Sequence, residues 1–177
     1  MLRLFAALAL PFDIVEGLAA HQTGLDLRWS PPENLHITLR FFGEVSEPAA
    51  DDLDGELARL SAPAFDLSLA GAGAFGEGER LSAVWAGVAD SPPLGRLAQA
   101  CEKAARRVGL KAETRVYHPH VTLAYLRGAD PVALAGWIQA NNLLRSPPFR
   151  AQRFGLYSSH ATRHGSRYVL ERDYRLS

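Results

Sequence analysis

The chain has 177 residues, of which 47% are hydrophobic and 21% are charged, a composition typical of one globular domain of ordinary size. Its nineteen basic and nineteen acidic side chains cancel, which excludes a protein that holds long nucleic acids through an overall positive field. The single cysteine, Cys101, excludes an internal disulfide and a thiolate metal cluster, and its apolar position in an expected helix predicts burial.

The N-terminal run from Leu2 to Leu10 resembles a secretory signal only loosely. Its apolar stretch is too short for that role, so we expect a buried strand there instead. No other segment of the sequence could span a membrane. We therefore expect a cytoplasmic protein without a membrane partner, and we expect it to be a monomer.

The first half of the chain is expected to alternate strands and helices. Pro11 suits the first turn of a helix, the double proline at 31–32 forces an extended entry into the next strand, and Ser46 can cap a second helix. The expected elements are a strand at 2–9, a helix at 11–21, a short edge strand at 27–29, a strand from 36, a helix at 48–60 and a strand at 65–69. A flexible link is predicted by the four glycines that follow, Gly71, Gly73, Gly76 and Gly78.

The second half repeats this order. Ser91 and Asp130, each followed by proline, mark the starts of two helices. The expected elements are a strand at 81–88, a helix from 92 to about 108, a strand at 117–126, a helix from 131 to about 141, and a hairpin of 148–158 with 167–176. We therefore predict an α+β fold with duplicated β-α-β-α-β units, two antiparallel-type sheets facing a central cleft, and helices outside. The pseudo-repeat halves are expected at about 1–78 and 79–177 of a single domain, 1–177.

One short polar motif occurs twice. The sequence H-I-T-L begins at His36 and returns 84 residues later as H-V-T-L at His120. Alternate residues of a strand share a face, so each histidine lies on the same face as the following Thr38 or Thr122, about 6.5 Å along the strand. A single copy is common by chance, but two copies at matching places in the two halves indicate a function. Two such strands facing each other would place an imidazole on each side of a phosphate.

The duplicated H-x-T-x element and its flanks, Pro-Pro-Glu-Asn-Leu-His-Ile-Thr-Leu and Pro-His-Val-Thr-Leu, resemble the two-histidine phosphoesterase superfamily. The closer resemblance is to its RNA 2',3'-cyclic phosphodiesterase branch, historically called 2'-5' RNA ligases, and it covers nearly the whole chain. The resemblance implies a bilobal, pseudo-two-fold domain with the motif strands lining the cleft. It further implies hydrolysis of terminal 2',3'-cyclic phosphates on RNA ends or nucleotides to 2'-phosphates, with 2'-5' ligation as the reverse reaction.

The residue types suit this chemistry. In-line displacement at phosphorus needs a general base and a general acid on opposite sides, with imidazole nitrogens about 8 to 9 Å apart. We assign His36 as the acid for the departing 3'-oxygen and His120 as the base for water. The hydroxyls of Thr38 and Thr122 can donate hydrogen bonds to the nonbridging oxygens. The sequence has no Gly-rich phosphate loop and no carboxylate cluster for magnesium, so we expect no cofactor and no metal.

Four further residues are candidates for substrate binding. Several relatives carry an arginine five residues after the second motif histidine, and here that position is Tyr125, with Arg127 two residues further on. Strand alternation predicts that Arg40 shares the face of the first motif histidine and points toward the cleft mouth. Tyr125 could stack on the terminal base if its strand is irregular at the end, and Phe41 is a second candidate for stacking.

Two alternatives remain open from the sequence. One is a His-rich metal-dependent phosphoesterase, because His118 and His120 form a strand-borne pair that His36, His160 or His164 could complete. The other is a non-catalytic module that binds RNA ends. It would use the same cleft and the aromatic residues Trp29, Phe41, Phe42 and Tyr125.

Overall fold

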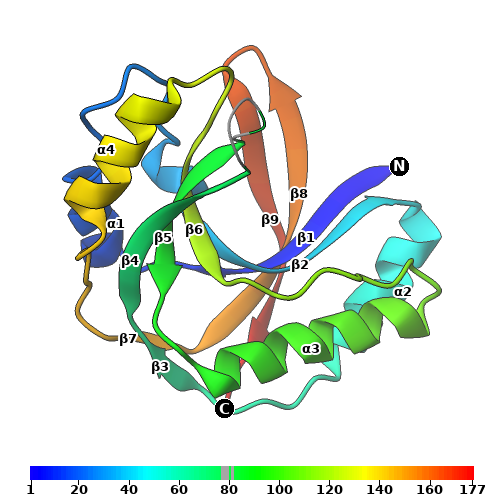
Figure 1. Cartoon of the computed structure of the whole chain (residues 1–177). Helices are drawn as coiled ribbons and strands as arrows, with labels where there is room; N and C mark the ends of the chain where they lie inside the picture. Colours follow the sequence, from blue (N-terminus) through cyan, green and yellow to red (C-terminus); the bar gives the residue numbers. More distant parts are fainter. Residues whose placement is uncertain (77–79, 81) are drawn as a thin grey trace.

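The computed structural model describes residues 1–76, 80 and 82–177, and it is a mixed α+β protein (Figure 1). The predicted class is therefore confirmed. In chain order the elements are β1 (Leu2–Ala9), α1 (Phe12–Ala19), the 3-10 turn η1 (Pro32–Asn34), β2 (His36–Val45), α2 (Glu47–Ala58), β3 (Phe65–Leu67), β4 (Leu69–Phe75), β5 (Ala83–Val88), α3 (Pro92–Arg107), β6 (His120–Tyr125), α4 (Pro131–Asn141), β7 (Phe149–Ala151), β8 (Arg153–Thr162) and β9 (Gly165–Arg175).

Most strands belong to one antiparallel sheet with the order β4-β5-β6-β2-β1-β8-β9, and β3 pairs with β7 in a small second sheet. The two sheets expected from the duplication are thus the two halves of one sheet. These halves meet where β2 and β6 pair, and the pairing consists of a single residue pair, Ile37 with Val121. Both side chains are fully buried, so the junction lies in the centre of the hydrophobic core.

The strand order is symmetric about the β2–β6 junction except for β9, which adds one strand at the edge beyond β8. On one side β2 is followed by β1 and β8, and on the other β6 is followed by β5 and β4. Strand β8 from the second part of the chain therefore flanks β1, while β4 from the first part flanks β5, so the two β-α-β-α-β units exchange strands. The boundary predicted near residue 78 lies outside the described residues, and the division into two halves remains a prediction.

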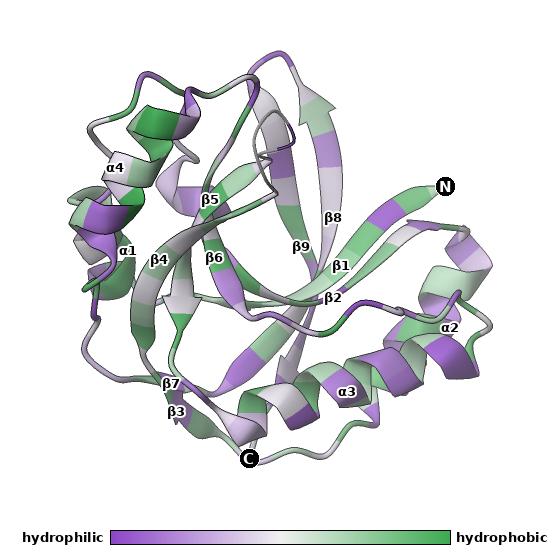
Figure 2. Cartoon of the chain, in the orientation of Figure 1, coloured by the Kyte–Doolittle hydropathy of each residue, from purple (hydrophilic) through white to green (hydrophobic). Residues whose placement is uncertain are grey.

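The helices form two pairs that cover different parts of the sheet (Figure 1). In the first pair, the His21 side chain just after α1 contacts Asn141 of α4 at 2.7 Å, and Trp137 donates to the His21 carbonyl. In the second, α3 lies beside α2 and packs on β2. The ribbon of α3 alternates between hydrophilic and hydrophobic residues, whereas that of β1 is largely hydrophobic (Figure 2). No helix among the described residues has the length and apolarity needed to cross a membrane.

The helix starts agree with the predicted caps. Ser46, Ser91 and Asp130 each accept a hydrogen bond from a backbone N–H in the first turn of the following helix. Helix α3 buries one apolar stripe that includes Cys101, and burial raises the pKa of this thiol to about 12. The prediction of a buried cysteine is confirmed.

Two local predictions are wrong. The expected edge strand at 27–29 is reduced to one bridge, Trp29 with Ala124. Gly71 and Gly73 belong to β4 rather than to a flexible link. The Trp85 ring covers Gly73, where a Cβ would lie 2.5 Å from it, so this position has no room for a side chain. Gly78, from the same predicted link, and Leu81, the predicted start of the next strand, lie outside the described residues.

The C-terminal hairpin is confirmed as β8 and β9, which are joined by a short turn between Thr162 and Gly165.

Candidate active site

The two motif strands bring their polar residues to the β2–β6 junction. Ile37 and Val121 point into the core, so the residues on either side of each point to the opposite face of the sheet. We call this opposite face the motif face. Its central members are half-buried, namely His36, Thr38, His120 and Thr122.

The antiparallel register pairs each histidine with the other strand's threonine. Because Ile37 lies opposite Val121, His36 lies toward Thr122, and Thr38 lies toward His120. The two histidines occupy one diagonal of this arrangement. Ideal strand geometry would separate their α-carbons by about 8 Å along it, a span that suits imidazoles on opposite sides of one phosphate.

Both catalytic candidates are held in the same way by backbone carbonyls. The Nδ1 of His36 lies 2.7 Å from the Asn34 carbonyl, and the Nδ1 of His120 lies 2.7 Å from the His118 carbonyl. A carbonyl oxygen only accepts, so each Nδ1 carries a hydrogen, and each Nε2 is left to exchange protons. In the neutral form, the Nε2 of His36 accepts from the Thr38 hydroxyl at 3.0 Å.

The environment of both imidazoles favours their neutral form. Burial lowers the pKa of His36 below its ordinary value, and the nearby His120 lowers it further, against the opposing effect of the Asn34 carbonyl. Burial also lowers the pKa of His120, against the opposing effect of the His118 carbonyl, and the charge of the His118 ring lowers it further.

The two histidines have different aromatic neighbours. His36 lies 5.0 Å from the ring centroid of Phe5 and 5.3 Å from that of Tyr168. His120 lies 4.6 Å from the ring of Phe75, which also contacts Trp85. The two sides of the site are thus chemically distinct although the motifs are alike.

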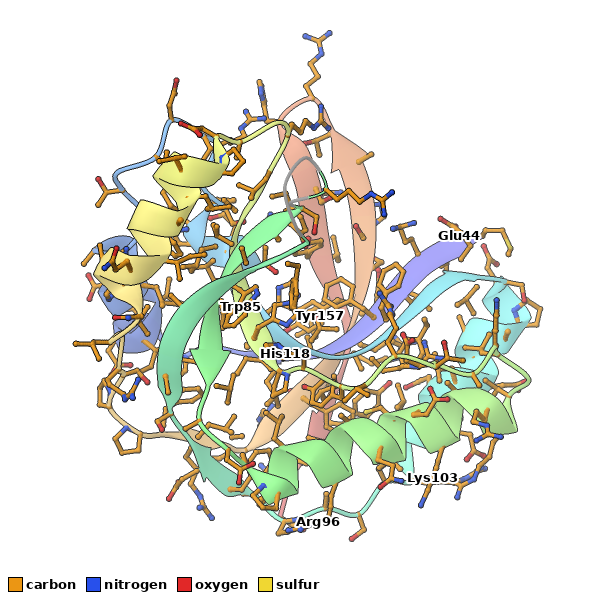
Figure 3. All side chains as sticks on the ribbon, viewed as in Figure 1. Glu44, Trp85, Arg96, Lys103, His118 and Tyr157 are labelled. Carbon is orange, nitrogen blue, oxygen red and sulfur yellow. The ribbon has the colours of Figure 1, made fainter. Side chains whose placement is uncertain are left out.

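Sequence patterns do not identify Phe5, Phe75, Trp85 or Tyr168 as neighbours of the motif histidines, and they single out His118 only as a metal-binding candidate. Phe5 and Trp85 lie on β1 and β5, the strands next to the motif strands, and Phe75 lies one strand further out on β4. His118 stacks edge-on against Trp85 at 4.9 Å. In Figure 3 both point toward the centre of the molecule, and Tyr157 of β8 points to the same region. The Trp85 Nε1 is buried without a hydrogen-bond partner among the described residues.

Arg40 does not point toward the substrate, and this prediction is wrong. The β1–β2 register skips Leu39, because Ala7 pairs with Thr38 and Ala6 with Arg40. This bulge turns Arg40 to the core face, where it is only 8% exposed. Its guanidinium donates to the Glu102 carboxylate and to the backbone carbonyls of Phe41 and, at 2.7 Å, Lys111.

The same bulge returns Phe41 to the motif face. Phe41 pairs with Phe5, which contacts His36, and it is 37% exposed. The guanidinium of Arg3 lies over the Phe41 ring at 4.8 Å.

Strand β6 repeats the irregularity, since the β5–β6 register skips Leu123. Tyr125 therefore also reaches the motif face, where it is 62% exposed. Its neighbour Tyr168 has a pKa raised by burial and further by Tyr125. Arg127 is exposed in the turn that follows β6.

The additional histidines are engaged elsewhere. His160 lies 2.8 Å from the Ser158 hydroxyl, and His164 lies 3.1 Å from the Arg28 guanidinium, both in the β8–β9 hairpin. Within the described part of the chain, no three histidine, cysteine or acidic side chains are grouped closely enough to hold a metal ion. The arrangement suggested for a metal-dependent enzyme is therefore not formed by these residues.

Two histidine-threonine pairs face each other across the strand junction, the arrangement expected of a two-histidine phosphoesterase. Residues 10–163 match the 2'-5' RNA ligase superfamily. The Escherichia coli RNA 2',3'-cyclic phosphodiesterase is 33% identical over 94% of this chain and 92% of its own length. The chain belongs to the 2'-5' RNA ligase superfamily.

Other relatives agree. The Aeropyrum pernix RNA 2',3'-cyclic phosphodiesterase is 41% identical over 60% of this chain, and that alignment spans 61% of the relative. Among solved structures, Escherichia coli LigT complexed with 3'-AMP superposes with a TM-score of 0.80 and 32% identity, covering 99% of this chain and 98% of its own. A protein from Thermus thermophilus gives a TM-score of 0.77 and 26% identity, covering 98% of this chain and 97% of its own.

Proposed function

We propose that this chain hydrolyses terminal 2',3'-cyclic phosphates, on RNA ends or on nucleotides, to 2'-phosphates. The observation that carries the proposal is the Ile37–Val121 register, which sets each motif histidine across from the other motif's threonine. Relatives named RNA 2',3'-cyclic phosphodiesterase support the same activity.

In the proposed reaction, the Nε2 of His120 takes a proton from water as the water oxygen bonds to phosphorus. The Nε2 of His36 gives a proton to the 3'-oxygen as the bond from phosphorus to that oxygen breaks. The phosphate remains on the 2'-oxygen, and proton exchange with solvent restores both imidazoles. The bound anion raises the pKa of His36, so the acid form becomes available when substrate is present.

The threonine hydroxyls of Thr38 and Thr122 donate to the nonbridging oxygens of the phosphate. When substrate binds, the Thr38 hydroxyl turns from the His36 Nε2 to the phosphate and frees that nitrogen for proton transfer. Phe41 and Tyr125 offer aromatic surface to the terminal base, and Arg127 offers a charge to the RNA backbone.

We further propose that the reaction needs no metal or cofactor, because imidazoles supply both proton transfers and hydroxyls supply the donors. A sample treated with EDTA should retain its full rate.

The protein would act as a cytoplasmic monomer, and the reverse transfer would join 2'-5' ends without ATP.

Phosphorus NMR of the product tests the proposal. With 2',3'-cyclic AMP, we expect the resonance of the cyclic phosphate to be replaced by that of adenosine 2'-phosphate. A 3'-phosphate product would contradict the choice of bond. An unchanged cyclic phosphate under single-turnover conditions would contradict the enzymatic activity and favour a binding module.

A further inference from the structure

The backbone ladder alone does not fix the spacing of the two motif strands. Strand β2 pairs along its length with β1, and β6 pairs with β5, but β2 and β6 share only the pair of Ile37 with Val121. Beyond this pair their facing edges are not hydrogen-bonded to each other. The backbone N–H and C=O groups on these edges must therefore bond to other segments of the chain, since buried backbone groups need partners.

The loop that leads into the second motif holds the edge of β2. The hydroxyl of Tyr117, three residues before His120, donates to the backbone carbonyl of Thr38 at 2.7 Å. Burial raises the pKa of Tyr117, so the phenol stays protonated and able to donate. One short hydrogen bond thus connects the chain just before one catalytic histidine to the threonine that follows the other.

The Arg40 network fixes this loop at two further points. Arg40 donates to the Lys111 carbonyl, and the Glu102 carboxylate that binds Arg40 also accepts from the backbone N–H of Glu113 at 3.1 Å. Helix α3, strand β2 and the 111–117 loop are therefore tied together. These hydrogen bonds hold the 111–117 loop in a fixed position against β2 and α3.

The loop that leads into the first motif does the same for β6. The backbone N–H of Ser30 donates to the Leu123 carbonyl at 2.8 Å, and Trp29 bridges Ala124. The Gln22 amide donates to the carbonyls of both Ser30 and Leu123. Each motif strand is thus held by the loop that precedes the other motif.

We infer that Tyr117 is a positioning residue that sets the separation of His36 and His120 through this reciprocal arrangement. The expected fall in rate rests on the proposed function, whereas the expected effect of Tyr117 on the separation of the two histidines does not. An acid and a base acting on opposite sides of one phosphorus are sensitive to their spacing, and displacements near 1 Å can cost up to about 100-fold in rate.

The test compares Tyr117→Phe with Tyr174→Phe. Each replacement removes one phenol hydroxyl that donates at 2.7 Å, and the Tyr174 hydroxyl binds Asp54, joining β9 to α2. For Tyr117→Phe we expect kcat on 2',3'-cyclic AMP to fall about tenfold with little change in KM. We expect both values to be unchanged in Tyr174→Phe once folding is verified by circular dichroism.

A nitrogen-15 NMR titration of the imidazoles supplies a readout that needs no turnover. Burial and the neighbouring His120 lower the pKa of His36, so wider spacing should raise that pKa toward its ordinary value in Tyr117→Phe. Gln22→Met removes the side-chain amide that donates to the Leu123 carbonyl of β6, and it should raise the pKa of His36 in the same way. An unchanged His36 titration in both variants would overturn the inference, even if kcat fell. Failure of the wild type to hydrolyse the nucleotide would instead contradict the proposed function.

Discussion

The guanidinium of Arg40 and the carboxylate of Glu102 form an ion pair on the core side of β2, and their side chains are 8% and 21% exposed. The bulge at Leu39 creates this pair by turning Arg40 away from the motif face. Arg40 therefore connects the first motif strand to α3 and to the loop before the second motif.

Arg40→Gln should act on stability rather than on substrate binding. Removing Arg40 leaves the Glu102 carboxylate without its ion-pair partner and the Lys111 carbonyl without this donor, and breaking a buried pair in this way costs about 3 to 5 kcal/mol. Because Glu102 is partly exposed, we expect about 3 kcal/mol or less, measured by urea unfolding. Arg127→Gln is the control on an exposed arginine and should leave the unfolding free energy unchanged. A raised KM with unchanged stability in Arg40→Gln would contradict this account.

Tyr125→Arg should strengthen binding of the cyclic phosphate. The bulge at Leu123 brings this position to the motif face, so an arginine there can reach a phosphate held by the motif residues. One charge-assisted hydrogen bond is worth about 1.5 to 3 kcal/mol, so KM should fall by about tenfold or more. The gain should shrink as salt is added, because the new contact is ionic. Steady-state kinetics at two ionic strengths checks both expectations, and a KM that rises or is independent of salt would refute them.

The sequence predicted the elements with local signals and missed those that depend on pairing. The starts of α2 and α3 were predictable because Ser46 and Ser91 cap them within a few residues. The motif histidines were predictable because their pattern is repeated. Arg40 was misplaced because alternation assumes a regular strand, and the bulge at Leu39 becomes evident only from the register with β1.

Contacts between distant segments could not be predicted for the same reason. The aromatic neighbours of His36 come from β1 and β9 and those of His120 from β4 and β5, so the strand order of the sheet decides them. No short-range pattern in the chain specifies that order. Tyr117 was expected only as a strand residue, since its contact with Thr38 joins positions that are far apart in the sequence.

Gly73→Ala should lower activity, whereas Gly17→Ala should not. A Cβ at Gly73 would lie 2.5 Å from the Trp85 ring and would push that ring toward His118, which it contacts. Gly17 lies within α1 with no atom near its Cβ position, so alanine there should raise the unfolding free energy by about 0.5 to 1 kcal/mol. Thermal unfolding and kcat/KM of both variants test the pair. Equal activity in the two variants would show that the Trp85 position is unimportant.

Stability should fall as the pH drops below the ordinary histidine pKa of 6.5. The folded-state pKa values of His36 and His120 lie below this value, so between the folded and unfolded values the unfolded chain binds more protons. Their contribution to stability is complete above pH 6.5 and is lost as the pH falls toward the folded-state values. Urea unfolding from pH 7.5 to pH 5 should show this slope, and His36→Asn should reduce it. An identical slope in the variant would contradict the burial effect at His36.

The central claim is that His36 and His120 are both required for one displacement at phosphorus. The most direct measurement is the single-turnover rate of 2',3'-cyclic AMP hydrolysis by the wild type, His36→Ala and His120→Ala, each after treatment with EDTA. We predict that the wild type keeps its rate and that each variant loses at least about 100-fold, because each removes one proton transfer. A variant that retains the wild-type rate, or a wild type that needs added metal, would contradict the account.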